Sequence, residues 1–530
     1  MSSCSKCGAS VVSKPDAFEF NITTGPRTLA RISQLLATNE PPQEAELVVL
    51  RPVAQQTAAR LACLDAEISR LHGQLRQLEE ERATLAEYHA QNTTIFSPSR
   101  RIPSEILGEI FLWSLPSPCS LNVADSPWVL THVCRLWRAV AVSKSSLWTR
   151  IHLNFANGKK YSLNIARTQI ERARTLKVGF YGSHDHDSGP QVDMLQLLVE
   201  RSSMWQELHL GLIAALVPPM SACAGRLPQL QRVRVQRDGQ KSQAGIESVD
   251  FLRMAASLVE ISVSNKTRFI PTPFPTSNRL TRYELDAPWT THYELLKSLP
   301  NLRDVRIIRN FDRGVPWPAP GEFIHLMYLR YMYISRAECL DYIIAPALES
   351  VVLQHHRSGQ IFSHLESFIA RSSCVLRRLV ISGLPETQPT EEILKHCPSV
   401  TELALRIGDF KTKDQDVERN VLCAFLTRFK FAISDSATPF LRLSKLDFSC
   451  QYADAIPYPL YLDMLDSWCN TRGCALKSSE LLLPKAFIHP DSQSLARMST
   501  LREAGLQIRS LSGETAQARV NQWIHVAGWR

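Results

Sequence analysis

The pattern that decides the fold is Leu302-Arg303-Asp304-Val305-Arg306-Ile307, in which apolar residues occupy the first, fourth and sixth positions. Side chains alternate between the two faces of a β-strand, so Val305 and Ile307 are expected on one face and Asp304 and Arg306 on the other. A recurring strand of this kind is typical of a protein built from structural repeats. The segments that share the frame are Trp205/Leu208/Leu210, Leu230/Val233/Val235, Leu258/Ile261/Val263, Leu280/Tyr283/Leu285, Leu302/Val305/Ile307, Leu329/Met332/Ile334, Leu348/Val351/Leu353, Leu376/Leu379/Ile381, Val400/Leu403/Leu405 and Leu443/Leu446/Phe448.

The spacing of these frames predicts a parallel sheet. Successive frames begin 19 to 28 residues apart, except for a last interval of 43, which indicates an insertion or a degenerate repeat. Helical patterns such as 293–299 and 362–370 lie between the strands, and strand, helix and strand at this spacing form a solenoid. We therefore predict an α/β solenoid with a parallel sheet over 160–515 and a C-terminal tail over 516–530. A non-repetitive α/β domain with similar strands is the alternative.

The frames resemble those of leucine-rich repeat proteins. The Asn that this family usually carries three residues after the last strand leucine occurs in one frame, at Asn310, so the resemblance implies a less regular solenoid. In such a strand the residues between the leucines face outward onto the concave surface. Tyr and Arg anchor protein interfaces more often than most residues do. We predict that Arg306, Tyr331, Tyr333 and Arg378, which occupy such positions, contribute to target binding.

Two short helical patterns lie ahead of the repeats. In 101–111, Pro103 suits the first position of a helix, and two apolar pairs with a spacing of four share one face, Ile106/Ile110 and Leu107/Phe111. In 126–138, Ser126 and Pro127 suit a helix start, and the apolar residues at helical spacing are Leu130, Val133, Cys134 and Trp137. A third turn at 145–148 ends the unit. So small a helical unit carries more large apolar side chains than it can cover by itself, which indicates a partner surface.

The order of these residues resembles the F-box family, and an F-box ahead of leucine-rich-like repeats is common in mushroom-type fungi. The shared positions are Ile102-Pro103, Glu105-Ile106-Leu107, Ile110-Phe111, Val133-Cys134-Arg135, Trp137-Arg138 and Leu147-Trp148, with Ile102 where Leu is commoner and Ser146 where many relatives have Pro. The resemblance implies a three-helix F-box over 97–155 that docks a Skp-type adaptor and, through it, a cullin and a RING subunit. The residues that it assigns to adaptor contacts or to their supporting core are Ile102, Pro103, Ile106, Leu107, Ile110, Phe111, Leu130, Val133, Trp137 and Trp148.

A heptad pattern precedes this segment. The apolar residues alternate steps of three and four positions, and Arg82 interrupts the seam that is formed by Leu61, Leu64, Ile68, Leu71, Leu75, Leu78 and Leu85. This spacing predicts a helix of the coiled-coil type over 57–92. Self-association of the helix, packing on the same chain and a free helix are all open. Residues 1–56 are rich in Ser, Thr, Pro and Gln, and we expect a flexible arm there.

Composition favours a soluble protein of the cytoplasm or nucleus. The 530 residues include 60 Lys and Arg against 51 Asp and Glu, scattered along the chain, which gives little case for nucleic-acid binding. The longest apolar run, 212–217, is far shorter than a membrane span. The 13 Cys occur as single residues, and their odd number favours a reducing compartment.

Two patterns that suggest metal ligands do not predict a metal site. Cys4-x-x-Cys7 has the spacing of half a zinc site, but no second half follows nearby. The run His184-Asp185-His186-Asp187 is flanked by Gly and Ser, which predicts a solvated loop. We therefore expect no metal and no cofactor.

The sequence contains no motif that predicts catalysis. It lacks the G-x-x-x-x-G-K-[ST], G-x-G-x-x-G, G-x-S-x-G and H-E-x-x-H patterns. In the family that the chain resembles, other subunits transfer ubiquitin, so we expect a non-enzymatic substrate-recognition adaptor of a Skp-cullin-F-box ubiquitin ligase. The alternatives are a non-degradative binding scaffold built on the same parts and an enzyme that uses the repeats as a frame.

Overall fold

The computed structural model describes residues 2–3, 10–11, 26–116, 121–275, 279–311, 314–319, 321–354, 361–408, 414–432, 439–451, 456–485 and 490–524. The chain divides into two compact units, Met1–Pro103 and Ser104–Arg530. Cys4 and Cys7, which were considered as half of a zinc site, lie outside the described residues.

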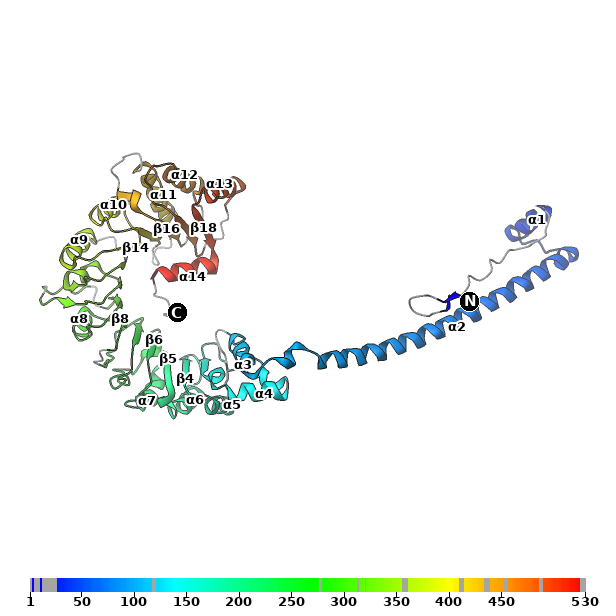
Figure 1. Ribbon diagram of the computed structural model, residues 1–530, viewed down its shortest axis with the longest axis horizontal. Helices are drawn as coiled ribbons and strands as arrows, with labels where there is room; N and C mark the ends of the chain where they lie inside the picture. Colours follow the sequence, from blue (N-terminus) through cyan, green and yellow to red (C-terminus); the bar gives the residue numbers. More distant parts are fainter. Residues whose placement is uncertain are drawn as a thin grey trace. The chain divides into compact units, whose positions relative to one another are not determined.

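A single long helix dominates the first unit. Helix α2, Glu44–Ile95, runs without a break through 52 residues, which corresponds to about 78 Å at 1.5 Å per residue (Figure 1). Helix α1, Pro26–Ala37, precedes it, and two short strands, β1 (Ser2–Ser3) and β2 (Ser10–Val11), form an antiparallel pair. A turn of 3-10 helix, η1 (Pro98–Arg101), follows α2.

Helix α2 begins earlier than the heptad pattern alone predicts. The expected start was near residue 57, and the range 1–56 was expected to be a flexible arm, whereas α2 starts at Glu44. The Glu46 carboxylate accepts a hydrogen bond from the Gln43 N–H group (2.8 Å), which satisfies one of the donors that a helix start leaves without an intrahelical partner. Glu46 also pairs with Arg31 of α1 (2.9 Å), so local capping and charge extend the helix beyond its apolar seam.

The second unit opens with a small helical region. Its elements are α3 (Ser104–Trp113), the 3-10 turn η2 (Val129–His132), α4 (Arg135–Ser143) and the 3-10 turn η3 (Ser145–Trp148). The helix predicted from Ser126 is therefore divided in two. Cys134 adopts an extended conformation and its sulfur accepts a hydrogen bond from the Trp137 N–H group (3.5 Å), which makes it the cap from which α4 begins.

Fourteen parallel strands form the sheet of the second unit, and each strand pairs with its neighbours in chain order. The strands are β3 (Arg150–Asn154), β4 (Leu176–Tyr181), β5 (Trp205–Gly211), β6 (Arg232–Arg237), β7 (Glu260–Asn265), β8 (Arg282–Asp286), β9 (Asp304–Ile308), β11 (Tyr331–Ile334), β13 (Ser350–Gln354), β14 (Arg378–Gly383), β15 (Glu402–Ile407), β16 (Lys445–Cys450), β17 (Ser478–Leu483) and β18 (Gln507–Ser512). Two short strands, β10 (Ile324–His325) and β12 (Ile343–Ile344), pair separately. The predicted parallel sheet is confirmed, and every predicted frame lies at one of these strands.

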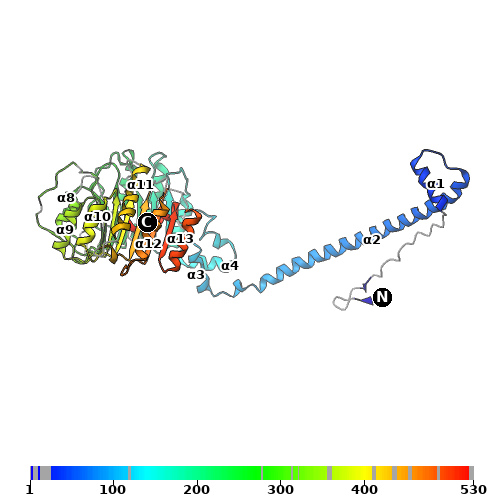
Figure 2. The ribbon, with the colours of Figure 1, turned by 90° about the horizontal axis from the view of Figure 1, so that it is seen from above.

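Helices and turns cover the face of the sheet that is opposite to the concave face. The helices are α5 (Leu163–Arg172), α6 (Gly189–Val199), α7 (Val217–Ser221), α8 (Trp289–Lys297), α9 (Ile361–Ser372), α10 (Thr387–His396), α11 (Gln415–Ala432), α12 (Tyr458–Cys469) and α13 (Ser492–Glu503), and Figure 2 shows α9 to α13 side by side. The 3-10 turns are η4 (Ser202–Met204), η5 (Ala214–Leu216), η6 (Lys241–Gln243), η7 (Ala337–Tyr342) and η8 (Pro439–Arg442). The long interval before the last predicted frame contains α11, so it is an insertion of helix.

The core lies between the sheet and these helices. The apolar residues of the stretch 302–307 have no exposed side-chain surface, and they are Leu302, Val305 and Ile307. Asp304 and Arg306, the residues between them, lie on the opposite, concave face of the sheet. Because the strands pair in register, residues at matching positions form continuous rows across that face, and Asp304 pairs with Arg282 on one side and with Tyr331 on the other.

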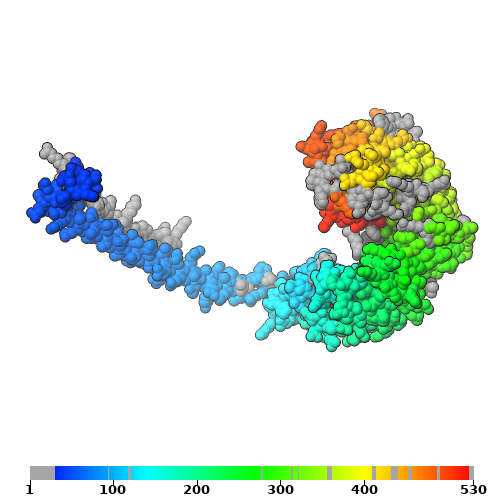
Figure 3. All heavy atoms as spheres, turned by 180° about the vertical axis from the view of Figure 1, so that it is seen from behind, coloured from blue at the N-terminus to red at the C-terminus, as the bar shows by residue number. Residues whose placement is uncertain are grey.

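Residues near the C-terminus form a helix that covers part of the concave face. Helix α14, Gly513–Ile524, packs on β17 and β18 and lies inside the arc of strands (Figures 1 and 3). Its buried residues, Ala516, Val520, Trp523 and Ile524, join a cluster with Val352, Val380, Ala404 and Leu482 of the sheet. The range 516–530 was expected to be a tail, but these apolar side chains at helical spacing pair with apolar positions on the sheet.

Candidate functional surfaces

The helical region at the start of the second unit leaves large apolar side chains on its surface. Ile106 and Ile110 lie one turn apart on α3 and are 54% and 46% exposed, and Val133, which precedes α4, is 57% exposed. Trp113 at the end of α3 is 89% exposed. Apolar side chains of this size gathered on a short helical unit are typical of a surface that meets another protein.

Other residues assigned to this surface form its core instead. Leu107, Phe111, Leu130 and Trp148 are buried. The Trp148 indole N–H donates to the Ala141 carbonyl oxygen (2.7 Å), and its ring meets Trp128 edge to face with centroids 5.1 Å apart. These four residues therefore support the exposed side chains and are not available for direct contact.

Trp137, Ile102 and Pro103 have intermediate or exposed positions. Trp137 is half-buried because its ring packs on Phe111, with centroids 4.9 Å apart. Ile102 is half-buried and Pro103 is exposed. Since Trp137 supports the core and also reaches the surface, a change at Trp137 would alter stability and the shape of the exposed surface together.

The helical region is attached to the first repeat by polar contacts. Gln169 of α5 donates to the carbonyl oxygens of Trp148 (3.4 Å) and Arg150 (2.7 Å) and accepts a hydrogen bond from the Trp128 indole (3.3 Å). The Arg172 guanidinium lies 4.4 Å from the centre of the Trp148 ring. A cation over an indole face is an attractive contact, and here it joins α5 to η3.

A ladder of alternating charges crosses the N-terminal part of the concave face. One row of the sheet contains, in strand order, Lys177, Glu207, Arg232, Glu260, Arg282 and Asp304. Neighbours in this row form ion pairs, with nitrogen to oxygen distances of 2.6 Å for Lys177 and Glu207, 2.7 Å for Arg232 and Glu207, and 2.9 Å for Arg282 and Asp304. The carboxylates of the row are therefore already neutralised by neighbours.

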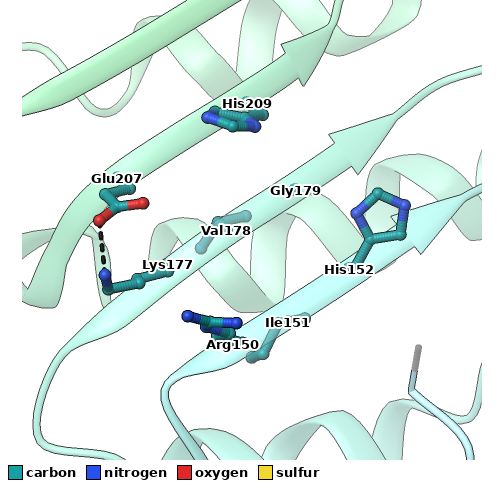
Figure 4. A pocket seen from close by; sticks show the side chains of 8 residues that line it. All are labelled: Arg150, Ile151, His152, Lys177, Val178, Gly179, Glu207 and His209. Carbon is teal, nitrogen blue, oxygen red and sulfur yellow. Dashed lines mark hydrogen bonds and ion pairs between the residues drawn. The ribbon is translucent and has the colours of Figure 1, made fainter. Parts of the chain in front are cut away.

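A hollow of about 170 Å³ lies at the start of this ladder. Figure 4 shows its lining side chains, which include Arg150 and His152 from β3, Lys177 from β4, and His209 from β5. Gly179 lies between the two histidines, and a Cβ atom there would come within 2.7 Å of the His152 ring. The glycine therefore leaves the space that the imidazole occupies. Arg150 is exposed and has no ion-pair partner among the described residues.

Burial favours the neutral form of the two imidazoles of this hollow. Burial lowers the pKa of His152, and the positive charge of Lys159 acts in the same direction. Burial also lowers the pKa of His209, with Arg234 adding to the effect. A neutral imidazole donates one hydrogen bond and accepts another. With Arg150 beside them, the two rings therefore suit a ligand that carries an acidic side chain and a second polar atom.

The four residues predicted to bind a target lie farther along the sheet, near α14. The Tyr331 hydroxyl donates to the Ile524 carbonyl oxygen (2.6 Å), and Arg306 donates to the same oxygen. The Arg306 guanidinium also lies 4.1 Å from the centre of the Tyr333 ring, and Tyr333 packs beside the α14 cluster. The structure brings these three residues together, but it places them against their own chain. Arg378 is half-buried and lies 3.8 Å from Glu402.

A buried carboxylate pair, Asp447 and Glu480, lies beside the middle of α14, where Arg519 contacts it. Glu480 of β17 accepts two hydrogen bonds from Arg519 (2.8 and 2.9 Å), and the Asp447 carboxylate accepts one from the Glu480 N–H group (3.0 Å). Burial raises the pKa of Asp447 to about 6, although Lys445 lies 3.2 Å away.

This pKa predicts a pH-dependent stability. A carboxyl group with a higher pKa in the folded state binds more protons when folded, so its contribution to stability falls as pH rises from about 4 to about 6. We expect Asp447→Asn to remove that fall, since the amide oxygen still accepts from Glu480. At about 1.4 kcal/mol per pKa unit, the variant should gain about 1–3 kcal/mol over wild type between pH 4 and pH 6.5, measured by urea unfolding. An identical pH slope for both proteins would contradict this.

The described residues give no indication of a metal centre or a membrane helix. No three His, Cys, Asp or Glu side chains among them come together as a metal site requires. In the loop of His184 to Asp187, Asp187 accepts from the Gly189 N–H group (3.0 Å), and the His186 ring lies 3.3 Å from the Ala156 carbonyl oxygen. No helix in the described ranges is both long enough and apolar enough to cross a bilayer.

The sequence pattern identified one of the two surfaces better than the other. The spacing of four identified the two apolar pairs of α3, which were predicted to share one face, but the structure exposes Ile106 and Ile110 and buries Leu107 and Phe111. The hollow at β3 to β5 was not predicted, although Trp148/Ile151/Leu153 and its neighbours carry the strand frame from which it follows.

Neither a family model nor a curated protein sequence matches the chain.

Proposed function

We propose that this protein is the substrate-recognition subunit of a Skp-cullin-F-box type ubiquitin ligase. The observation that carries the proposal is the division of the F-box-like residues into two groups. Leu107, Phe111 and Trp148 form a core, while Ile106 and Ile110 remain on the surface above it. The proposal assigns this exposed surface, with Val133, to a Skp-type adaptor, and the leucine-rich-repeat-like solenoid to a target protein.

The arrangement of the second unit suits such a task. The contacts of Trp148 with Gln169 and Arg172 tie the helical region to the first repeat, so adaptor and target would be held on one body. A ligase subunit of this kind does no chemistry itself. It raises the effective concentration of a target lysine near the carrier of ubiquitin, which is a matter of positioning.

The same proposal assigns target recognition to the open part of the concave face. Helix α14 covers strands at the C-terminal end, whereas the rows of β3 to β7 carry Arg150, Lys177, Arg232 and Arg234 against two carboxylates, Glu207 and Glu260. An excess of cations on a concave surface attracts acidic partners. The target would therefore present an acidic segment, with one carboxylate or phosphate group in the hollow beside Arg150.

The adaptor arm of the test uses Ile106. Ile106→Asp in the full chain is expected to weaken binding of a purified Skp-type adaptor at least thirtyfold, about 2 kcal/mol, because a charge would replace an apolar contact at the centre of the surface. Met254→Asp, at a site of the repeats that is 67% exposed, is the matched control. The measurement is calorimetric titration, with circular dichroism to show that both variants fold. Absence of adaptor binding by the wild type would reject the proposal.

The target arm of the test identifies the proteins that co-purify with the adaptor-bound chain and are stabilised when the cullin is inhibited. These proteins are then compared between the wild type and its variants. We expect Arg150→Glu to lose them, and Arg253→Glu, in the connection between β6 and β7, to retain them. Loss with Tyr331→Ser and Tyr333→Ser together, but not with Arg150→Glu, would return recognition to the originally predicted residues. Adaptor binding without cullin-dependent turnover of any bound protein would favour a non-degradative scaffold.

A further inference from the structure

Helix α2 carries an apolar seam that the structure leaves open. Its seven Leu and Ile residues are 42% to 62% exposed, and they are Leu61, Leu64, Ile68, Leu71, Leu75, Leu78 and Leu85. Gly73 lies inside this stretch, and glycine disfavours an isolated helix. A helix with a solvated leucine seam gains little from packing, whereas burial of the same seam against another helix is strongly favourable.

We propose that α2 pairs with a second copy of itself in a parallel, two-stranded coiled coil. The inference concerns the first unit and does not rest on the function proposed above. With Leu61 at heptad position a, the a positions are Leu61, Ile68, Leu75 and Arg82, and the d positions are Leu64, Leu71, Leu78 and Leu85. The regular a and d seam is what two helices in a left-handed coiled coil share.

Charges beside the seam favour the parallel arrangement. In a parallel pair, position g of one helix lies near position e of the next heptad on the other. This places Arg60 near Asp65 of the second copy and Glu67 near His72 of the second copy, with no like charges in contact at these positions. Glu67 also bonds Arg70 within its own helix (2.6 Å).

The antiparallel arrangement is disfavoured by the same residues. When the a and d positions of 61–85 are aligned in opposite directions, g faces g and e faces e. Glu67 then lies opposite Glu81, and Asp65 lies opposite Glu79. Like charges at such positions are destabilising, and both contacts occur twice in a symmetric dimer. The charge pattern therefore discriminates between the two directions.

Arg82 at position a favours an assembly of two helices over one of three or more. A polar residue at one a position fixes the register and number of helices, because it must keep access to water or a partner charge. In the parallel pair, Arg82 lies beside Glu81 of the second copy, which supplies that charge. In a coiled coil of two helices the long Arg side chain can extend outward to water. The more crowded core of a larger assembly would not leave room for this.

The first test measures the mass of the full chain by sedimentation equilibrium over a range of concentrations. The wild type is expected to reach the mass of two copies at micromolar concentration, and Leu71→Glu to raise the dissociation constant at least about tenfold. Ala66→Glu, which adds the same charge on the outer face of the helix, is the matched control and should leave the mass unchanged. Circular dichroism reports whether each variant keeps its helix.

A second test determines the direction of the helices. Asp65→Arg places two positive charges together in the parallel pair, with Arg60, but creates an attractive contact with Glu79 in the antiparallel one. We expect weaker self-association, by several-fold, and recovery when Arg60→Asp is added. Tighter association of Asp65→Arg would overturn the parallel arrangement. A wild type that stays a single copy at all concentrations, an assembly of three or more copies, or an unaffected Leu71→Glu variant would overturn the proposal as a whole.

Discussion

Trp148→Ala is expected to reduce the unfolding free energy by about 3–5 kcal/mol, the usual range for removal of a buried tryptophan. Trp148 has no exposed surface, donates to the Ala141 carbonyl oxygen, and contacts both the Trp128 ring and the guanidinium of Arg172. The substitution leaves a cavity, and the carbonyl oxygen loses its donor. Because these contacts join the helical region to the first repeat, both should be destabilised together.

The measurement is urea unfolding, with far-ultraviolet circular dichroism as the signal. Trp113→Ala removes the same side chain from a position that is 89% exposed and should change the unfolding free energy by less than about 0.5 kcal/mol. Equal effects of the two substitutions would show that Trp148 does not hold the helical region to the repeats. A Trp148→Ala protein that is as stable as the wild type but has lost adaptor binding would also show that Trp148 does not hold the helical region to the repeats.

Trp523→Ala is expected to release α14 from the concave face, with a loss of about 3–5 kcal/mol in the interaction that holds it. Trp523 is 1% exposed in a cluster with Val352, Val380 and Ala404. Without the indole, the helix keeps its polar contacts, which are the bonds of Arg519 to the buried Glu480 and those of Tyr331 and Arg306 to the Ile524 carbonyl oxygen. Each of these contributes less than the indole, about 0.5–3 kcal/mol. Residues 513–524 should then lose protection against amide hydrogen exchange.

Glu514→Ala, at an exposed position of the same helix, is the control and should leave exchange in α14 unchanged. A second readout is binding of an apolar dye, which should rise in Trp523→Ala because the sheet side of the cluster becomes accessible. Normal protection of residues 513–524 in Trp523→Ala would contradict the prediction, since it would mean that the helix is held mainly by its polar contacts.

The strands could be predicted where their inward positions are apolar. Every predicted frame lies at a strand of the sheet because Leu, Ile and Val at those positions fill the core. Strand β17 was missed because Ser479 stands at a core position. Its hydroxyl is fully buried and is satisfied by Tyr461 (2.7 Å) and by the Leu446 carbonyl oxygen (2.6 Å). A hydrogen bond replaces an apolar contact there, and a pattern of apolar residues cannot reveal it.

The position of α14 was not predicted, although the sequence contains a signal for it. Val352, Val380 and Ala404 occupy outward positions on three consecutive strands, where a solvated face would carry polar residues. Apolar side chains in such a row indicate a cover. The identity of the cover depends on contacts between residues far apart in the chain, such as Tyr331 and Ile524, and local patterns do not encode these.

The helical region shows the opposite balance. The spacing of Ile106 and Ile110 gave a face, and the structure leaves that face open. The start of α4 could not be predicted, because it depends on the conformation of Cys134 and not on apolar spacing. The N-terminal arm was expected to be flexible because it is rich in Ser, Thr, Pro and Gln, but α2 already begins at Glu44, where Glu46 caps the helix.

The ion-pair ladder constrains how the repeat array can change in length. Positive and negative residues alternate along the row, so its chemical period is two strands. Loss of β6 alone would bring Glu207 beside Glu260, and loss of β7 alone would bring Arg232 beside Arg282. Removal or duplication of two adjacent repeats would preserve the alternation. In this region, evolution of the array is therefore expected to proceed by pairs of repeats, with the pair as the unit of duplication.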